Sequence, residues 1–292
     1  MSLTQLSRPA GVVTTALPLP GDSWGTGDAV AALLTARDLI PLSLPAPVVV
    51  SSLTTVVLRC GDFAVKVYPP GTDPTHLTRV SAALAGSTAA HLPVCAPVVT
   101  EQGIVTVTPW VATAGSVSWG ELGSLLRSFH EQHAGADLPL WSPLSRLASQ
   151  VASLPDEPAG VLLEARATLL TALGEVQSAL GDAVVHGDVS PGNVLRGPRG
   201  PVLIDLDWVA RAPREYDLSS ASRRVAVGEV SPQCYAEFCA SYGFDVRSWP
   251  GLPVLNRIAD LGGVAFRIWE CRRQGLTLDW MDAELRGWRT PL

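Results

Sequence analysis

Charge is scarce in this chain of 292 residues. Asp, Glu, Lys and Arg together make up 16% of it, whereas an average globular protein holds about 25%. No run of Lys or Arg forms the basic patch that nucleic-acid binding normally requires, so we expect no nucleic-acid partner. The net charge of −6 is too small to identify a cationic substrate.

Cysteine is also scarce, and its pattern excludes two kinds of cross-link. The five cysteines are odd in number, and none lies in a Cys-x-x-Cys pair. A disulfide framework or a zinc site needs cysteines in matched numbers or at fixed spacing. We therefore predict reduced thiols and a cytoplasmic location.

The sequence lacks a segment suited to entering or crossing a membrane. Residues 1–10 have no apolar core of the kind found in secretory signals. Residues 39–58 carry no charge, but Pro41, Pro45 and Pro47 lie among them and would each disrupt a spanning helix. We expect no membrane partner.

The elements that are present divide the chain into a strand-rich first part and a helix-rich second part. In the first part, the sequence predicts helices at 27–40 and 74–90 and strands at 54–60, 63–69, 96–100 and 103–109. In the second part, it predicts helices at 119–134 and 158–180, two short strands, and further helices from about 214. The boundary near residue 112 gives an α+β protein with domains 1–112 and 113–292.

The polar residues that could carry chemistry gather around one predicted hairpin, formed by strands 193–196 and 201–205. Counting back from its four-residue loop sets Asn193 opposite Ile204 or, after a shift of one residue, opposite Asp205. Either register brings the backbones of Asn193 and Asp205 within about 5 to 8 Å. Their amide and carboxylate oxygens suit Mg²⁺, which takes few protein oxygens and shares phosphate oxygens with a substrate.

A third carboxylate precedes this pair. Asp188 lies five residues before Asn193, and a carboxylate beside bound metal and phosphate can accept a hydroxyl proton. Protein kinases use such an Asp, a metal-binding Asn and a second Asp in one lobe, together with a Lys on a strand of the other. Here Asp188, Asn193, Asp205 and Lys66 match those roles in order.

The segment HGDVSPGN (186–193), followed by LIDLDW, resembles the aminoglycoside phosphotransferase-like family of small-molecule kinases. The segments FAVKVY, VTVTPWVATAG and LGSLLRSFHEQH resemble its nucleotide-lysine strand, adenine-binding hinge and first C-lobe helix. The resemblance implies a bilobal protein-kinase-like fold, with an antiparallel β-sheet and helices in the N-lobe and a mainly helical C-lobe carrying a short catalytic hairpin. It implies Asp188 as the base, Asn193 and Asp205 as Mg²⁺ ligands, and Lys66 as a phosphate ligand.

The resemblance also implies where ATP or GTP binds. Backbone groups near Pro109 and Val111 would contact the base. Ser51, Ser52 and Thr54 would lie in the loop that covers the phosphates.

Two features depart from the family. The segment VVSSLTTVV replaces a glycine-patterned phosphate loop, so hydroxyl and backbone groups would contact the phosphates. Helix 75–90 contains no acidic residue, whereas the family pairs its strand lysine with a Glu there. Lys66 is then expected to pair with Asp205 or with Glu101, or else the active state is assembled differently.

Several other polar residues are expected to support the site. The resemblance implies that Asp217 buttresses the catalytic loop. His186, otherwise a candidate ligand or acid, is expected to be structural because Asp188 already fills the role of base. Asp207 is expected to be structural, with assistance to the metal as the alternative. His130 and His133, three apart on a helix, have no evident third metal ligand and are expected to pack.

Three functions are carried forward. The leading hypothesis is transfer of the γ-phosphate of a Mg-bound nucleoside triphosphate to a hydroxyl of a small molecule, with aminoglycosides and other antibiotics among the candidates. The alternatives are a non-catalytic kinase-like nucleotide-binding protein and an adaptor that uses exposed tryptophans. Asp279, Asp282 and Glu284 are candidates for a cationic acceptor site, although charged residues on a terminal helix are mostly solvated. The acceptor, the choice of ATP or GTP, and the oligomeric state stay open.

Overall fold

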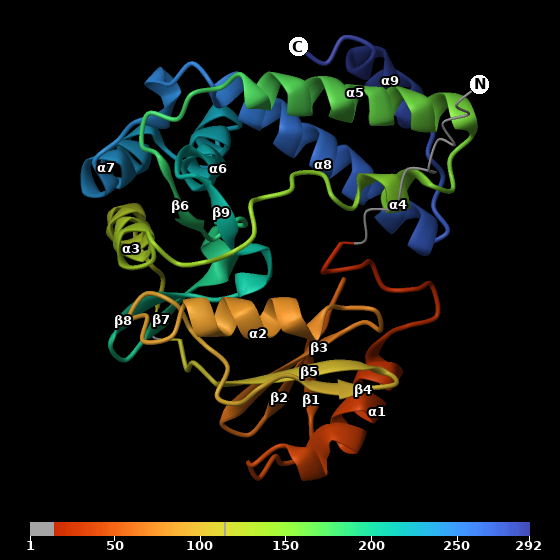
Figure 1. Cartoon of the computed structure of the whole chain (residues 1–292), viewed down its shortest axis with the longest axis vertical. Helices are drawn as coiled ribbons and strands as arrows, with labels where there is room; N and C mark the ends of the chain where they lie inside the picture. Colours follow the sequence, from red (N-terminus) through yellow and green to blue (C-terminus); the bar gives the residue numbers. More distant parts are fainter. Residues whose placement is uncertain (1–14, 114) are drawn as a thin grey trace, which may run out of the picture.

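The computed structural model describes residues 15–113 and 115–292, which form two lobes (Figure 1). One lobe holds an antiparallel sheet of five strands in the order β1-β2-β3-β5-β4. Helices α1 and α2 lie on opposite sides of this sheet, and α2 faces the other lobe (Figure 1). The elements of this lobe are α1 (Thr26–Ala36), β1 (Val48–Ser52), β2 (Val56–Cys60), β3 (Phe63–Tyr68), α2 (Pro74–Ala83), β4 (Val98–Thr100) and β5 (Gly103–Pro109).

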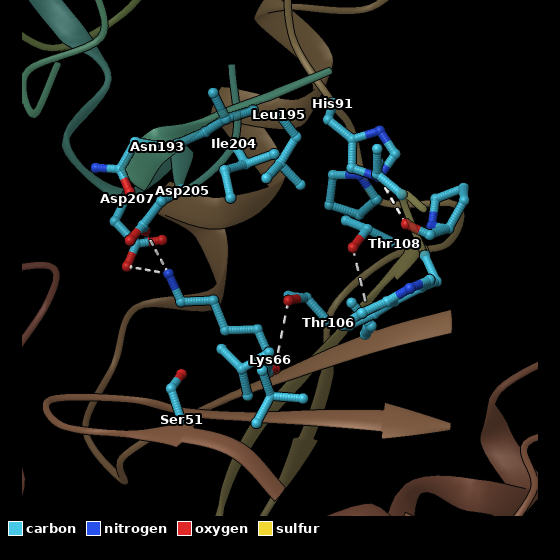
Figure 2. Close-up of a pocket in the computed structure, with 18 of the residues that line it drawn as sticks. Ser51, Lys66, His91, Thr106, Thr108, Asn193, Leu195, Ile204, Asp205 and Asp207 are labelled. Carbon is cyan, nitrogen blue, oxygen red and sulfur yellow. Dashed lines mark hydrogen bonds and ion pairs between the residues drawn. The ribbon is translucent and has the colours of Figure 1, made fainter. Parts of the chain in front are cut away.

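The β2–β3 hairpin presents Lys66 to the space between the lobes. Gly61 makes its tight turn with φ of +60°, a conformation that glycine adopts without steric cost. Val65 and Val67 are fully buried in the core beneath α1. Since successive side chains of a strand point to opposite faces, Lys66 points the other way, toward the second lobe (Figure 2).

The second lobe is mainly helical. Its helices are α3 (Trp119–Gln132), α4 (Leu147–Val151), α5 (Asp156–Gly174), α6 (Glu215–Ala226), α7 (Pro232–Tyr242), α8 (Leu252–Arg273) and α9 (Met281–Trp288). Its strands form two antiparallel pairs, β6 (Asp182–Val185) with β9 (Ala210–Pro213) and β7 (Val194–Gly197) with β8 (Gly200–Leu203). Helix α3 starts with a capping box of Ser118 and Glu121, and its apolar face, including Leu126 and Phe129, joins the core of this lobe.

The β7–β8 hairpin has the predicted register. Ile204 lies opposite Asn193, and its N–H donates to the Asn193 carbonyl oxygen at 2.9 Å. The alternative register with Asn193 opposite Asp205 is wrong. Strand β8 ends at Leu203, two residues earlier than predicted, because Asp205 adopts a left-handed backbone conformation with φ of +60° that a strand cannot continue through.

Two predicted helices end earlier than their apolar pattern suggested: helix 74–90 stops at Ala83 and helix 158–180 stops at Gly174. Between residues 15–113 and 115–292, no helix is both long and apolar enough to cross a membrane. The predicted boundary near residue 112 falls in the connector between β5 and α3.

The segment 15–24 contacts both lobes. The Trp24 indole N–H donates to Gln102 O of the first lobe at 2.8 Å, while the Arg146 Nε of the second lobe donates to Leu17 O at 2.5 Å. Leu17 is buried in a small cluster that includes Tyr68. The lobes are therefore connected by this segment as well as by the chain after β5.

Candidate active site

The loop 186–193, the candidate catalytic loop, is held by a buried carboxylate. Oδ2 of Asp217 accepts the backbone N–H of His186 at 2.7 Å, and Oδ1 accepts that of Gly187 at 2.9 Å. The ring Nε2 of His130 also donates to Asp217 Oδ2, at 2.9 Å. Burial acts to raise the pKa of Asp217, but these hydrogen bonds outweigh burial and lower it.

The loop also requires a glycine. Gly187 has φ of +83°, and a Cβ added there would lie 2.4 Å from the carbonyl oxygen of Trp208. His186 is fully buried. Its Nε2 donates to the Ile204 carbonyl oxygen at 2.8 Å, and its Nδ1 accepts the Asp188 N–H at 3.2 Å, so the ring is a structural support, in line with expectation.

Asp188 and Asn193 lie in direct contact. Asn193 Nδ2 donates to the Asp188 carboxylate at 3.0 Å and to the Asp188 carbonyl oxygen at 2.8 Å. Both oxygens of Asp188 can only accept hydrogen bonds, so the NH₂ group of Asn193 must face them. The amide oxygen Oδ1 of Asn193 then points elsewhere and is left to bind another group. Burial, reinforced by the nearby Asp205 carboxylate, raises the pKa of Asp188 although His186 acts to lower it.

Lys66 reaches two carboxylates of the second lobe. Its Nζ lies 2.5 Å from Asp205 Oδ1 and 2.6 Å from Asp207 Oδ2 (Figure 2). Burial acts to lower the pKa of Lys66, but the two carboxylates outweigh burial and raise it. Glu101, the other expected partner, lies exposed in the turn between β4 and β5.

Asp207 is fixed from the first lobe by a residue that the sequence did not single out. The Tyr68 hydroxyl donates to Asp207 Oδ1 at 2.8 Å. Tyr68 lies two residues after Lys66 on β3, so both side chains point to the same face of the sheet. This spacing is the signal that could have identified Tyr68. Asp207 thus contacts Lys66 directly and is more than a remote structural support.

A cleft of about 530 Å³ lies between the lobes beside Lys66. Val57 and Ala64 line it from the sheet. Leu195 and Ile204 line it from the second lobe (Figure 2), which leaves a slot between apolar walls. Two walls of this kind suit a flat aromatic base. The remaining lining includes polar groups at both ends of the slot.

Of the predicted nucleotide contacts, Pro109, Val111 and Ser51 line the cleft, whereas Ser52 and Thr54 do not. His91, which no sequence pattern indicated, also lines it, and its Nε2 donates to the Pro109 carbonyl oxygen at 2.7 Å (Figure 2).

A second cavity, of about 400 Å³, borders Asp188 and is lined mainly by α6. The C-terminal candidates Asp279, Asp282 and Glu284 line neither this cavity nor the interlobe cleft. His130 and His133 are buried, as expected for packed residues. Among the described residues, no group of three or more His, Cys, Asp or Glu side chains is arranged to hold a metal ion by itself.

A model of the phosphotransferase enzyme family (APH) matches residues 45–253. The chain belongs to this family. The match includes the catalytic loop, the hairpin and Lys66, and it identifies the protein as a small-molecule kinase, in agreement with the leading sequence hypothesis and against the adaptor hypothesis. No curated protein matches the chain.

Solved kinases share the fold of this phosphotransferase. The amicoumacin kinase hAmiN, solved with AMP-PNP, Ca²⁺ and Ami, has a TM-score of 0.67 at 12% identity over 88% of this chain and 91% of its own. A choline/ethanolamine kinase family protein from Mesorhizobium loti has a TM-score of 0.55 at 18% identity over 90% of each chain. Aminoglycoside phosphotransferase APH(3'')-Id from Streptomyces rimosus has a TM-score of 0.54 at 21% identity over 76% of this chain and 96% of its own. These likenesses confirm the bilobal kinase-like fold.

Proposed function

We propose that this kinase transfers the γ-phosphate of Mg-ATP to a hydroxyl group of a small molecule. The observation that carries the proposal is the meeting of Asp188, Asn193 and Asp205 with Lys66 from the opposite lobe, at the end of a slot between apolar walls. In this assignment residues 1–112 bind the nucleotide, and residues 113–292 supply the metal site and the acceptor site.

ATP is the donor that the hinge favours. The Pro109 carbonyl oxygen has a second lone pair beside its bond to His91, so it can accept the amino group of adenine, while guanine would present a carbonyl oxygen to it. The Val111 N–H would donate to the ring. The AMP-PNP bound to the similar hAmiN supports the same choice.

The oxygens offered by this chain fit Mg²⁺. Asn193 Nδ2 faces Asp188, so Asn193 Oδ1 has no partner in this pair. Asp205 Oδ1 accepts from Lys66, which leaves Asp205 Oδ2. Asn193 Oδ1 and Asp205 Oδ2 would therefore hold the ion. Two protein oxygens suit Mg²⁺, which keeps waters and phosphate oxygens as its other ligands. When bound, the ion would neutralise charge on the phosphates.

The residues of this chain would act mainly by positioning and charge. Lys66, held by two carboxylates, would bind phosphate oxygens. Asp188 would accept a hydrogen bond from the acceptor hydroxyl, orient it, and take its proton as the phosphorus–oxygen bond forms. The antibiotic kinases of similar fold make an antibiotic one candidate acceptor. We propose a cytoplasmic location because all five cysteines are unpaired.

The test compares Asp188→Asn with Asp182→Asn, an exposed aspartate of β6. With a panel of hydroxylated acceptors and Mg-ATP or Mg-GTP, Asp188→Asn should lower turnover by about 10² to 10⁴-fold and leave the melting shift caused by Mg-AMP-PNP unchanged. Equal turnover of both variants would contradict the assignment, and nucleotide-induced stabilisation with no transfer would support the non-catalytic alternative.

A further inference from the structure

The cavity beside Asp188 is separate from the interlobe cleft, and the hydrogen-bonded pair Asp188 and Asn193 lies at the border between the two. Asp188 lines this cavity and Asn193 lines the cleft, and the two side chains are 3.0 Å apart. A molecule in the cavity can therefore present a hydroxyl to Asp188 at the border with the cleft, next to Asn193. The inference that follows rests on the proposed phosphotransferase function and concerns what this cavity selects.

Two adjacent arginines of α6 line the cavity with most of their donors free. Arg223 uses Nη1 for the Asn256 carbonyl oxygen at 2.7 Å and for Asp260 at 2.9 Å. Arg224 uses Nη1 for Glu229 at 2.6 Å. Within residues 15–113 and 115–292, neither guanidinium group donates a hydrogen bond through Nε or Nη2. A guanidinium fork with free donors matches the geometry of a carboxylate or a phosphate.

The carboxylates around the cavity are already engaged. Asp217 accepts three hydrogen bonds from the loop backbone and His130, and Glu229 pairs with Arg224. Asp188 is the remaining carboxylate of the described lining, and its role is to face the hydroxyl. Asp260 pairs with Arg223 and Glu229 pairs with Arg224, so each guanidinium group has one carboxylate partner and keeps its other donors. An acceptor with several ammonium groups would find no unpaired carboxylate in the described lining apart from Asp188, whereas the remaining donors suit an anion.

We propose that the cavity accepts a small hydroxylated anion, with its carboxylate or phosphate bound by Arg223 and Arg224 and its hydroxyl at Asp188. The volume of about 400 Å³ lies in the range of small-molecule sites. This selectivity separates the protein from kinases that act on aminoglycosides, whose acceptors are polycations.

The test uses compounds that share a six-carbon polyol skeleton: gluconate, glucose 6-phosphate, glucose and glucosamine. L-Homoserine and kanamycin extend the panel toward small hydroxy acids and polycations. Transfer of labelled phosphate from Mg-ATP should be at least tenfold more efficient, in kcat/KM, to carboxylated or phosphorylated compounds than to neutral or cationic ones. The gluconate and glucose 6-phosphate arms distinguish the two kinds of anion.

The variants locate the selectivity. Arg224→Gln should raise KM for the anionic acceptor by about 10- to 100-fold, the effect of losing a charged hydrogen-bonded partner, with KM for ATP unchanged. Arg286→Gln, an exposed arginine of α9, is the matched control and should change neither constant. Arg223→Gln is a second variant, with circular dichroism reporting whether α6 and α8 still pack.

Three results would overturn the inference: transfer to kanamycin or glucosamine in preference to the anions, transfer to no anion, or an unchanged acceptor KM in both arginine variants. The melting shift with Mg-AMP-PNP, measured on the same protein, separately decides whether the nucleotide site stands. Transfer to kanamycin, glucosamine or glucose but to no anion would reject the anionic acceptor and keep the phosphotransferase function, whereas a clear nucleotide shift with no transfer to any compound would count against both.

Discussion

Replacing Asp217 by Asn should destabilise the protein and misplace the catalytic loop. Three donors converge on this carboxylate: His130 Nε2 and the backbone N–H groups of His186 and Gly187, at 2.7 to 2.9 Å. An Asn of the same shape offers one oxygen and one NH₂ group. The best orientation keeps the oxygen toward His130 and His186 and turns the NH₂ group against the Gly187 N–H.

The magnitude follows from that count. One buried N–H loses its acceptor, which costs about 1 to 3 kcal/mol, and the other two hydrogen bonds lose their charged acceptor, which costs about 1 kcal/mol each. We therefore expect the free energy of unfolding to fall by about 3 to 5 kcal/mol at neutral pH. Because the loop backbone loses an anchor one residue from Asp188, turnover should fall by more than tenfold.

Urea denaturation followed by circular dichroism measures the change, with Asp182→Asn as an exposed control expected within about 0.5 kcal/mol of wild type. The pKa of Asp217 is lowered in the folded protein. Its stabilisation is thus complete above the ordinary carboxyl pKa and is lost as the pH falls through the lower folded value. The variant should show a smaller loss of stability on acidification. A destabilisation below about 1 kcal/mol, or an unchanged acid dependence, would refute this account of the loop.

Two further predictions concern the loop and Lys66. Gly187→Ala should lower the free energy of unfolding by more than about 1 kcal/mol, since φ of +83° and a contact of 2.4 Å with Trp208 O both oppose a Cβ. The control in the same denaturation assay is Gly160→Ala, where a Cβ meets nothing within 4 Å. Equal stability of the two variants would contradict the prediction. Asp207→Asn should raise KM for ATP by about tenfold, because Lys66 loses one of its two charged partners. Initial-rate kinetics measures this constant. An unchanged KM would show that Asp207 does not position the lysine.

The sequence predicted the catalytic half of the site well because that half is local. Asp188 and Asn193 are separated by four residues, and the tight turn of the hairpin sets the distance from Asn193 to Asp205; the pairing of Gly197 with Gly200 shortens the expected four-residue loop to two residues without changing the register. Turn residues and a short hairpin leave few alternative arrangements. One feature escaped even here: Asp205 enters the left-handed region, which ends β8 early and which no periodicity could indicate.

The other half was only partly predictable because it depends on the packing of the two lobes. The family resemblance named Asp205 as one of two possible partners of Lys66, and the structure shows that pair, but nothing in the sequence around Lys66 indicated Asp207 as its second partner. His91 lies in an irregular segment between α2 and β4, and it reaches Pro109 only once the sheet has formed. The C-terminal acidic residues were offered as acceptor contacts because the family often uses its C-terminal helices for this purpose, and they line neither cavity.

The missing helix glutamate gains a physical explanation from these contacts. A kinase that pairs its strand lysine with a Glu on the next helix sets the lysine within the N-lobe alone. Here α2 offers no acid, and both carboxylates that hold Lys66 come from the segment after β8. Since Tyr68 of the same strand also bonds Asp207, the lysine is placed by the contact between the lobes. Residues 15–24, which form hydrogen bonds with both lobes, then stabilise this placement of Lys66 because they hold the two sides of that contact together.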